Sequence, residues 1–210
     1  MDSLATDPRL TTAVAAVLSY LVGSLSFAVI VSRLFGLNDP RTYGSGNPGA
    51  TNVLRSGHKG AAVLTLVFDA LKGYVPVFIA HRLGLGQTAV TLIGLAAFLG
   101  HLWPVFFRFE GGKGVATAAG VLLAFEPSLG GLVLGVWLLM AIVFRYSSLA
   151  ALTASLAAPV IQWQLMGAGA MTVGVAIMSV LLIWRHAANI KKLLAGQESK
   201  LGQKAAPPPP

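Results

Sequence analysis

A single lysine lies among glycines immediately before an apolar run, in the order Gly111, Gly112, Lys113 and Gly114. If the run forms a helix, its first turn leaves unpaired backbone N–H groups and the positive end of the helix dipole at this point. Together with an ammonium group, these donors would form a phosphate-binding site. The spacing differs from that of a nucleotide-binding P-loop, because a glycine follows the lysine. A basic anchor at a membrane surface is the alternative, but an anchor would not require three glycines.

A second glycine-rich segment covers residues 38–55. Its glycines at 44, 46 and 49 allow backbone N–H groups to turn inward around an anion. Arg55 ends the segment and can bind a phosphate through two parallel hydrogen bonds. Glycine-rich loops are also common connectors, so this segment alone leaves both interpretations open. Its hydroxyl and amide side chains include Ser45, Asn47, Thr51 and Asn52.

Two further polar segments follow apolar runs, at residues 145–148 and 185–198. The first begins with Arg145 and ends with two serines, Ser147 and Ser148. The second carries apolar residues at helical spacing, which predicts an amphipathic helix at a membrane surface. Neither segment by itself indicates a particular chemistry.

Three titratable residues fall within apolar runs. His101 lies at the inner end of a run, where it could serve as a general base or as a hydrogen-bonding group, and we favour the second role. Asp69 and Lys72 lie three residues apart on one helical face, so we expect an ion pair that makes their burial tolerable. We interpret this pair as structural, and the alternative is that it lines the site.

The elements that must position these residues are membrane helices. Of the 210 residues, 55% are apolar and only 10% are charged, whereas soluble domains are about 25% charged. This composition excludes a soluble enzyme domain. The absence of cysteine excludes disulfides and thiol nucleophiles. The seven acidic residues form no paired motif that would hold a divalent metal, so we expect no metal or cofactor.

Seven apolar runs divide the chain, and we predict an all-α polytopic membrane protein in which each run crosses the bilayer once. A helix needs about 20 apolar residues to cross about 30 Å of hydrocarbon. We expect residues 1–204 to form one integral-membrane domain and residues 205–210 to form a disordered proline-rich tail. The runs are Leu10–Ser32, Ala61–Ala80, Leu83–Phe107, Val115–Phe125, Leu129–Phe144, Leu149–Met166 and Ala170–Trp184.

The distribution of basic residues predicts the orientation. With the N-terminus outside, 12 of the 15 Lys and Arg residues follow the first, third, fifth or seventh run. The positive-inside rule makes that side, with the C-terminus, cytoplasmic. Merging the fourth and fifth runs would move Arg145 and the basic C-terminal segment outside. The four polar segments then meet at the cytoplasmic face. The basic residues are not gathered into one stripe or tail, so we expect no nucleic-acid partner.

A membrane carrier for a phosphorylated solute is the alternative function. A carrier would place polar residues at mid-membrane and show inverted repeats. Here the only intramembrane charges are Asp69 and Lys72, and no repeat is evident. An enzyme acting at the cytoplasmic face is therefore favoured.

Three segments resemble the cytoplasmic motifs of the bacterial acyl-phosphate:glycerol-3-phosphate acyltransferases, the PlsY family. They are GSGNPGATNVLR at 44–55, GHLWPVFFRFEGGKGVAT at 100–117 and RHAANIKKLLAGQES at 185–199. The resemblance implies a seven-span enzyme of the bacterial inner membrane with an active site facing the cytoplasm. It implies transfer of a fatty acyl group from acyl phosphate to the sn-1 hydroxyl of glycerol 3-phosphate, the first step of phospholipid synthesis. The products would be lysophosphatidic acid and phosphate.

The resemblance also implies partners and residue roles. Besides the two substrates and membrane lipid, a soluble enzyme that synthesises acyl phosphate is an expected partner. The implied catalytic residues are Ser45, Arg55, Lys113, Asn189 and Glu198. The residues implied to bind substrate or phosphate are Gly44, Gly46, Asn47, Thr51, Asn52, His101, Gly111, Gly112, Gly114, Arg145, Ser147, Ser148 and His186.

The predicted orientation can be tested by introducing single cysteines, since the chain has none of its own. Cysteine at Ser56 or Gln197 should react with a membrane-impermeant thiol reagent only from the cytoplasmic side. Cysteine at Gln87 should react only from the outside, because the chain crosses the membrane between these positions. Labelling of the Gln87 variant from the cytoplasm would overturn the map.

Overall fold

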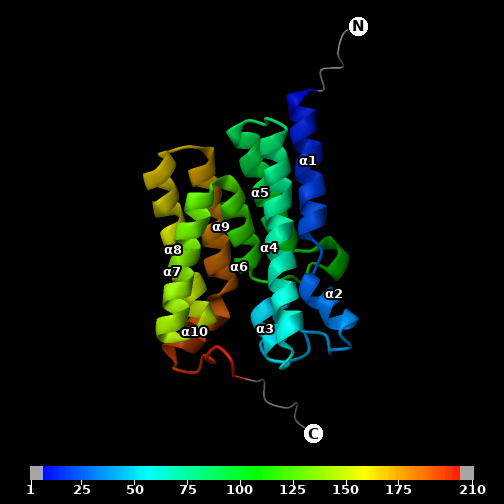
Figure 1. The fold of residues 1–210 in the computed structure, drawn as a ribbon, viewed down its shortest axis with the longest axis vertical. Coiled ribbons are helices and arrows are strands. Elements are labelled where there is room, and N and C mark those ends of the chain that lie inside the picture. The colour runs from blue at the N-terminus through cyan, green and yellow to red at the C-terminus, as the bar shows by residue number, and fades with distance from the viewer. Residues whose placement is uncertain (1–6, 204–210) are drawn as a thin grey trace.

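The described part of the chain, residues 7–203, folds into helices that mostly run along one long axis (Figure 1). In this computed structural model no strand occurs among those residues, and the tail expected at 205–210 lies outside them. The apolar composition therefore yields a helical bundle, as predicted. The elements are α1 (Pro8–Gly23), α2 (Phe27–Leu34), α3 (Ala50–Leu54), α4 (Lys59–Arg82), α5 (Gln87–Leu102), η1 (Val105–Phe107), α6 (Val115–Phe125), α7 (Pro127–Phe144), α8 (Ser147–Met166), α9 (Ala170–Arg185) and α10 (Ala187–Leu194).

The first apolar run forms two helices, α1 and α2, which are bent by 42° relative to each other. A bend breaks the backbone hydrogen-bond ladder, so the freed groups need other partners. Ser24 donates its hydroxyl to the Tyr20 carbonyl at 2.8 Å. The buried Lys72 ammonium of α4 donates to the Leu25 carbonyl at 2.7 Å. The lysine thus stabilises the break from a neighbouring helix.

Four spans, formed by α4, α5, α7 and α8, are long and apolar enough to cross a membrane. The span of α5 includes the residues that follow this helix up to Phe107. Counting the bent pairs α1–α2 and α9–α10 as one span each gives up to six. The fourth predicted run forms α6, whose 11 residues cover about 17 Å at 1.5 Å each. It is too short to cross the hydrocarbon by itself. None of its residues is exposed, because α4, α5, α7 and α9 surround it.

The outward faces of the long helices carry large apolar side chains. Ile142 of α7, Leu156 of α8 and Val180 of α9 are 74%, 62% and 66% exposed. Monomeric soluble proteins rarely expose contiguous apolar surface of this extent. The outer surface is therefore suited to contact with lipid tails, as the sequence predicts.

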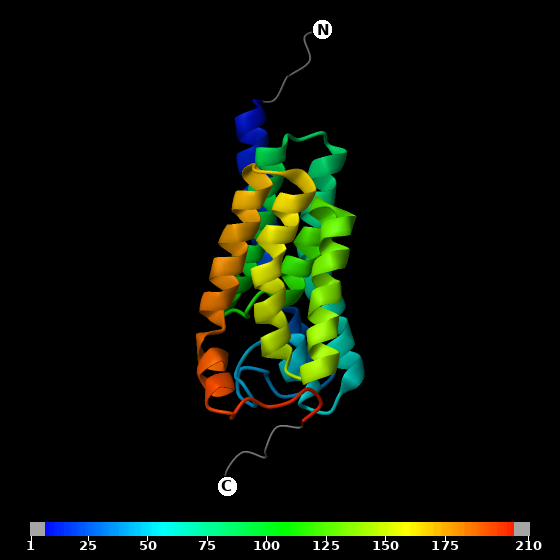
Figure 2. The ribbon, with the colours of Figure 1, turned by 90° about the vertical axis from the view of Figure 1, so that its left-hand side faces the viewer.

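The two ends of the bundle differ in what they carry (Figures 1 and 2). The start of α1 lies at one end, and α3, α10 and the segment after α10 lie together at the other. The segment from Trp103 to Gly114, which includes η1, instead enters the bundle partway along its length. This placement lets α6 be short, because α6 begins inside the bundle.

Glycines allow α4 and α6 to pack with their backbones in contact. A Cβ at Gly120 of α6 would collide with the Ala70 carbonyl oxygen of α4. A Cβ at Gly73 of α4 would collide with the Thr117 carbonyl oxygen of α6. Small residues at helix crossings are the common basis of close packing in membranes. The position of α6, and of the loop that precedes it, depends on these two contacts.

Gly120→Leu should therefore separate α4 from α6. Overpacking costs about 1–3 kcal/mol, and we expect the upper part of that range because the obstructing atom is backbone. This corresponds to a fall in Tm of about 6–12 °C in detergent. Gly131→Leu on α7 is the matched control, since a Cβ there meets nothing within 4 Å. Equal Tm values for the two variants would contradict the packing argument.

Candidate active site

One cavity of about 700 Å³ opens at the end of the bundle that carries α3 and α10. Polar groups from the loops and helix ends surround its mouth, and apolar residues of α6–α9 line its interior. All five residues predicted to be catalytic line it: Ser45, Arg55, Lys113, Asn189 and Glu198. So do eight of the predicted binding residues: Asn47, Thr51, Asn52, His101, Gly114, Ser147, Ser148 and His186.

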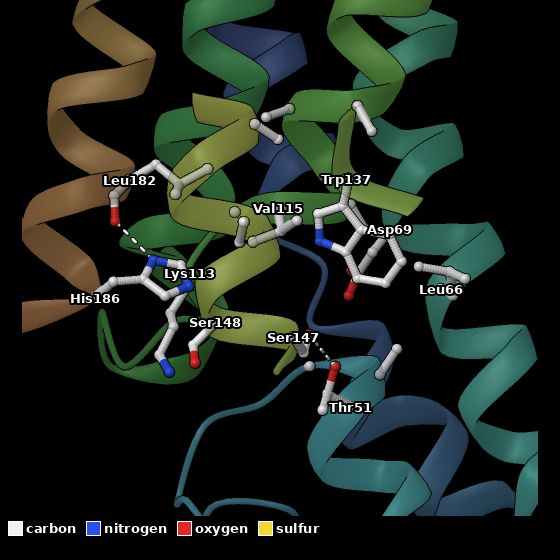
Figure 3. Close-up of a pocket in the computed structure, with 18 of the residues that line it drawn as sticks. Thr51, Leu66, Asp69, Lys113, Val115, Trp137, Ser147, Ser148, Leu182 and His186 are labelled. Carbon is white, nitrogen blue, oxygen red and sulfur yellow. Dashed lines mark hydrogen bonds between the residues drawn. The ribbon is translucent and has the colours of Figure 1, made fainter. Parts of the chain in front are cut away.

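Lys113 belongs to a network that joins three distant segments. Its ammonium donates to Asn189 Oδ1. Asn189 Nδ2 and Ser148 Oγ both donate to Glu198 Oε1, each at 2.7 Å. Figure 3 shows Lys113, Ser148 and His186 gathered on one side of the cavity. The loop before α6, the start of α8 and the segment around α10 are therefore held together by one set of hydrogen bonds.

The charge of Lys113 is poorly solvated. Burial lowers the pKa of Lys113 to about 8, the nearby Glu198 carboxylate opposes this shift, and the cationic Arg55, Lys192 and Arg185 add to it. The ammonium is thus mostly protonated at neutral pH and is lost as pH rises above about 8. Because the site holds an excess of cationic groups around Lys113, a phosphate anion would be favoured there.

The glycines before Lys113 bring the loop against His101 and Arg185. Arg185 donates from Nη2 to the Gly111 carbonyl at 2.7 Å and from Nε to the Gly112 carbonyl at 3.2 Å. The Gly112 N–H donates to the His101 carbonyl at 3.2 Å. A Cβ at Gly112 would collide with the His101 ring. Gly111 and Gly112 do not line the cavity, and the Gly112 N–H already has a protein partner.

Asn52 organises the first glycine-rich loop from inside. It is 1% exposed, and its Nδ2 donates to the Pro40 and Tyr43 carbonyls at 2.6 and 3.1 Å. Its Oδ1 accepts from the Ser45 N–H at 3.0 Å. Gly44 and Gly46 adopt positive φ values, 59° and 67°, and lie outside the cavity lining. Asn52 therefore lines the cavity, but its side-chain amide stabilises the loop through these hydrogen bonds.

The remaining predicted residues fall into two groups. Thr51 and Ser147 contact each other through their hydroxyls at 3.2 Å, and His186 donates from Nδ1 to the Leu182 carbonyl at 2.8 Å, as Figure 3 shows. The Nε2 atom of His186 is thereby left as an acceptor. Arg145 lies outside the cavity and is exposed, and its carbonyl accepts from the Leu201 N–H at 2.7 Å.

Several further residues lie at the cavity without having been predicted as site residues. Ser199 accepts a hydrogen bond from Arg55 Nη2 at 2.5 Å, and Lys59 and Lys200 line the mouth. Ser199 ends the third motif, whereas Lys59 and Lys200 only lie close to motif residues in the sequence. Asp69 and Lys72 form the expected ion pair at 2.7 Å, but Asp69 also lines the cavity, 3.7 Å from His101 Nδ1.

The cavity offers cations and hydroxyls but no cluster of metal ligands. Within residues 7–203 no group of three or more His, Cys, Asp or Glu side chains could hold a metal ion. The groups present can bind phosphate oxygens and stabilise negative charge. The chemistry that fits these groups is transfer between phosphorylated molecules, one of them with an apolar part.

Comparison with known proteins agrees with this geometry. Residues 13–196 match the sequence model of the glycerol-3-phosphate acyltransferase family. A glycerol-3-phosphate acyltransferase of Dechloromonas aromatica is 60% identical over 192 residues, which cover 91% of this chain and 97% of the relative. One of Burkholderia lata is 62% identical over 192 residues, covering 90% of this chain and 91% of the relative.

Two crystal structures of PlsY (YgiH), an integral membrane glycerol 3-phosphate acyltransferase, have the same fold. The glycerol 3-phosphate form has a TM-score of 0.87 at 40% identity and covers 91% of this chain and 96% of the solved one. The lysophosphatidic acid form has a TM-score of 0.84 at 39% identity and covers 90% and 95%. By sequence and fold, this chain belongs to the glycerol-3-phosphate acyltransferase family of integral membrane enzymes.

Proposed function

We propose that this enzyme transfers a fatty acyl group from acyl phosphate to the sn-1 hydroxyl of glycerol 3-phosphate. The products would be lysophosphatidic acid and inorganic phosphate. One observation carries the proposal: a single cavity joins a mouth of cations and hydroxyls to an interior lined by apolar side chains. A reaction between a soluble phosphate ester and an acyl donor with a phosphate at its head needs both environments at one place.

The polar end would hold the two phosphates. Arg55, Lys59 and Lys113 contribute positive charge to the cavity, against the carboxylates of Asp69 and Glu198. The network through Asn189 and Glu198 orients Lys113 before substrate arrives. Such preorganised charge lowers the cost of stabilising the transition state.

The reaction itself needs little from the protein. Acyl phosphate is a mixed anhydride, so the substrate hydroxyl can attack its carbonyl carbon directly. The new C–O ester bond forms first and gives a tetrahedral oxyanion, and the bond between the carbonyl carbon and the phosphate oxygen then breaks as the carbonyl re-forms. The hydroxyl proton leaves with the departing phosphate, whose dianion is a sufficient base. Cationic side chains at the mouth, such as Arg55 and Lys113, would stabilise this oxyanion.

The acyl chain would enter from the bilayer between α4 and α7. These two helices both border the cavity, through Leu66 and Trp137, but they do not pack against each other extensively. Figure 3 shows Leu66 and Trp137 on the side of the cavity away from His186. Leu66 is 50% exposed, so lipid tails can reach this opening. The lipid product could return to the membrane by the same route.

We further propose that the chain passes through the bacterial inner membrane seven times, with α6 and the loop before it together forming one pass, and that the cavity faces the cytoplasm. The basic residues at the cavity end and the opposite placement of the start of α1 and of α10 support this orientation. A soluble enzyme that makes acyl phosphate would then supply the donor from the same side.

A carrier for a phosphorylated solute is supported less well. Carriers need a polar route from one face to the other. The charged lining here is confined to the half of the cavity nearer its mouth, and the deeper lining is apolar except for the hydroxyls of Ser155 and Ser179.

The donor can be identified with purified enzyme and glycerol 3-phosphate. Palmitoyl phosphate should yield lysophosphatidic acid, whereas palmitoyl-CoA should not. Activity should survive excess EDTA, because no metal is invoked at any step. Turnover of the CoA ester at a comparable rate, or loss on chelation with rescue by Mg²⁺, would contradict the proposal. Uptake of glycerol 3-phosphate into proteoliposomes without acylation would favour the carrier instead.

Replacement of Lys113 tests the phosphate contact. Losing a charge-assisted bond to a partly desolvated phosphate costs on the order of 2–4 kcal/mol. Lys113→Ala should therefore lower kcat/KM by roughly 30- to 1,000-fold. Lys113→Arg should also be impaired, because a planar guanidinium does not fit a site shaped for a compact ammonium.

Lys191→Ala is the matched control, since it removes the same charge from α10 without touching the cavity. It should lower kcat/KM by about fivefold at most, since the attraction of one lysine to lipid is worth about 1 kcal/mol. Correctly inserted Lys113 variants that keep near-wild-type kcat/KM would show that Lys113 only anchors the helix.

A further inference from the structure

The deep part of the cavity is a closed pouch, in contrast to its mouth. Asp69 is the deepest residue of α4 that lines the cavity. The opening between α4 and α7 is therefore confined to the half of the cavity nearer its polar mouth. Beyond that level the walls come from α6, α7, α8 and α9. Each of these helices packs against the next, and α9 packs back against α6. These four helices therefore surround an apolar chain in this part of the cavity.

The deepest lining residue on each of these helices is Leu122 of α6, Val133 of α7, Ala158 of α8 and Val175 of α9. We call these four residues the end layer. About one helical turn further from the cavity mouth, each helix carries a residue that is buried and does not line the cavity: Phe125, Leu129, Gln162 and Met171. The pouch therefore ends at the end layer, where a packed layer closes it.

Small side chains on α8 create the space that leads to the end layer. Ala151, Ala154, Ser155 and Ala158 succeed one another on one face of the helix, and all line the cavity. The next residue of that face is Gln162, whose amide atoms have no hydrogen-bond partner among the described residues. A longer side chain at any of the small positions would fill the pouch.

We propose that the end layer sets the length of acyl chain that the enzyme can bury; this inference rests on the proposed use of acyl phosphate. Ser148, at the polar end, and Ala158 are ten residues apart on α8, which is about 15 Å. An extended chain of tetrahedral carbons advances about 1.3 Å per carbon, from bonds of about 1.5 Å. The pouch therefore accepts about a dozen carbons beyond the reacting carbonyl.

This depth predicts a break in the chain-length dependence. Each additional buried methylene should raise kcat/KM by about fourfold. The increase should stop at about a dozen carbons, when the tail reaches the end layer. Ala158→Leu extends a side chain into the pouch and should move the break about two carbons lower. In this variant, the ratio of kcat/KM for an acyl phosphate long enough to reach the end layer to that for decanoyl phosphate should be on the order of tenfold lower than in the wild type.

The experiment measures kcat/KM for saturated acyl phosphates from octanoyl to stearoyl, with glycerol 3-phosphate, in wild type and variants. Ala157→Leu is the matched control, because the neighbouring residue of α8 does not line the cavity. It should leave the chain-length dependence unchanged. Val133→Ala, which deepens the pouch, should move the break toward longer chains even if Ala158→Leu fails to fold.

Two results would overturn the inference. The first is a wild-type kcat/KM that keeps rising to stearoyl phosphate, which would mean that the tail leaves sideways between α4 and α7. The second is an equal change in Ala158→Leu and Ala157→Leu. A wild-type enzyme that turns over no acyl phosphate would instead refute the proposed donor.

Discussion

The hydrogen bonds from Lys113 through Asn189 to Glu198, and from Ser148 to the same carboxylate, join parts of the chain that are far apart in sequence. In an apolar bundle such groups have no alternative partner in lipid, so leaving one unpaired costs more than it would in water. The network therefore positions the loop before α6, the start of α8 and the segment after α10 at once. The cationic end of the cavity depends on it.

The same constraint explains the irregular backbone inside the bundle. Non-helical chain at membrane depth requires partners from protein or from a water-filled cavity. The loop before α6 obtains them from Arg185 and from the His101 carbonyl. The break between α1 and α2 obtains one from Lys72. Burying the charges of Arg185 and Lys72 costs free energy, but these side chains supply the hydrogen bonds that hold the loop and the kink in place.

The lining of the cavity changes from polar at its mouth to mostly apolar in its interior. Its mouth, where glycine loops and helix ends meet, carries cationic side chains, and its interior between α6 and α9 is lined mostly by apolar side chains. Enclosure by four helices gives the interior a defined depth, whereas the opening near Leu66 and Trp137 connects it to lipid. A bundle of this kind can therefore act on a soluble and a lipid substrate without moving either across the membrane.

The amino-acid sequence by itself determined the apolar runs, the accumulation of basic residues at one end and the glycine-rich segments, because these depend on composition and local spacing. It also indicated the Asp69–Lys72 pair, since three residues along a helix return to one face. Only the tertiary structure decided that Asn52 is a buried support, that the Gly111 and Gly112 carbonyls bind Arg185, and that α6 is a short internal helix. The same holds for the depth of the pouch at Ala158. Each of these features depends on which distant side chain supplies a missing partner or wall, and periodicity along the chain carries no information about that choice.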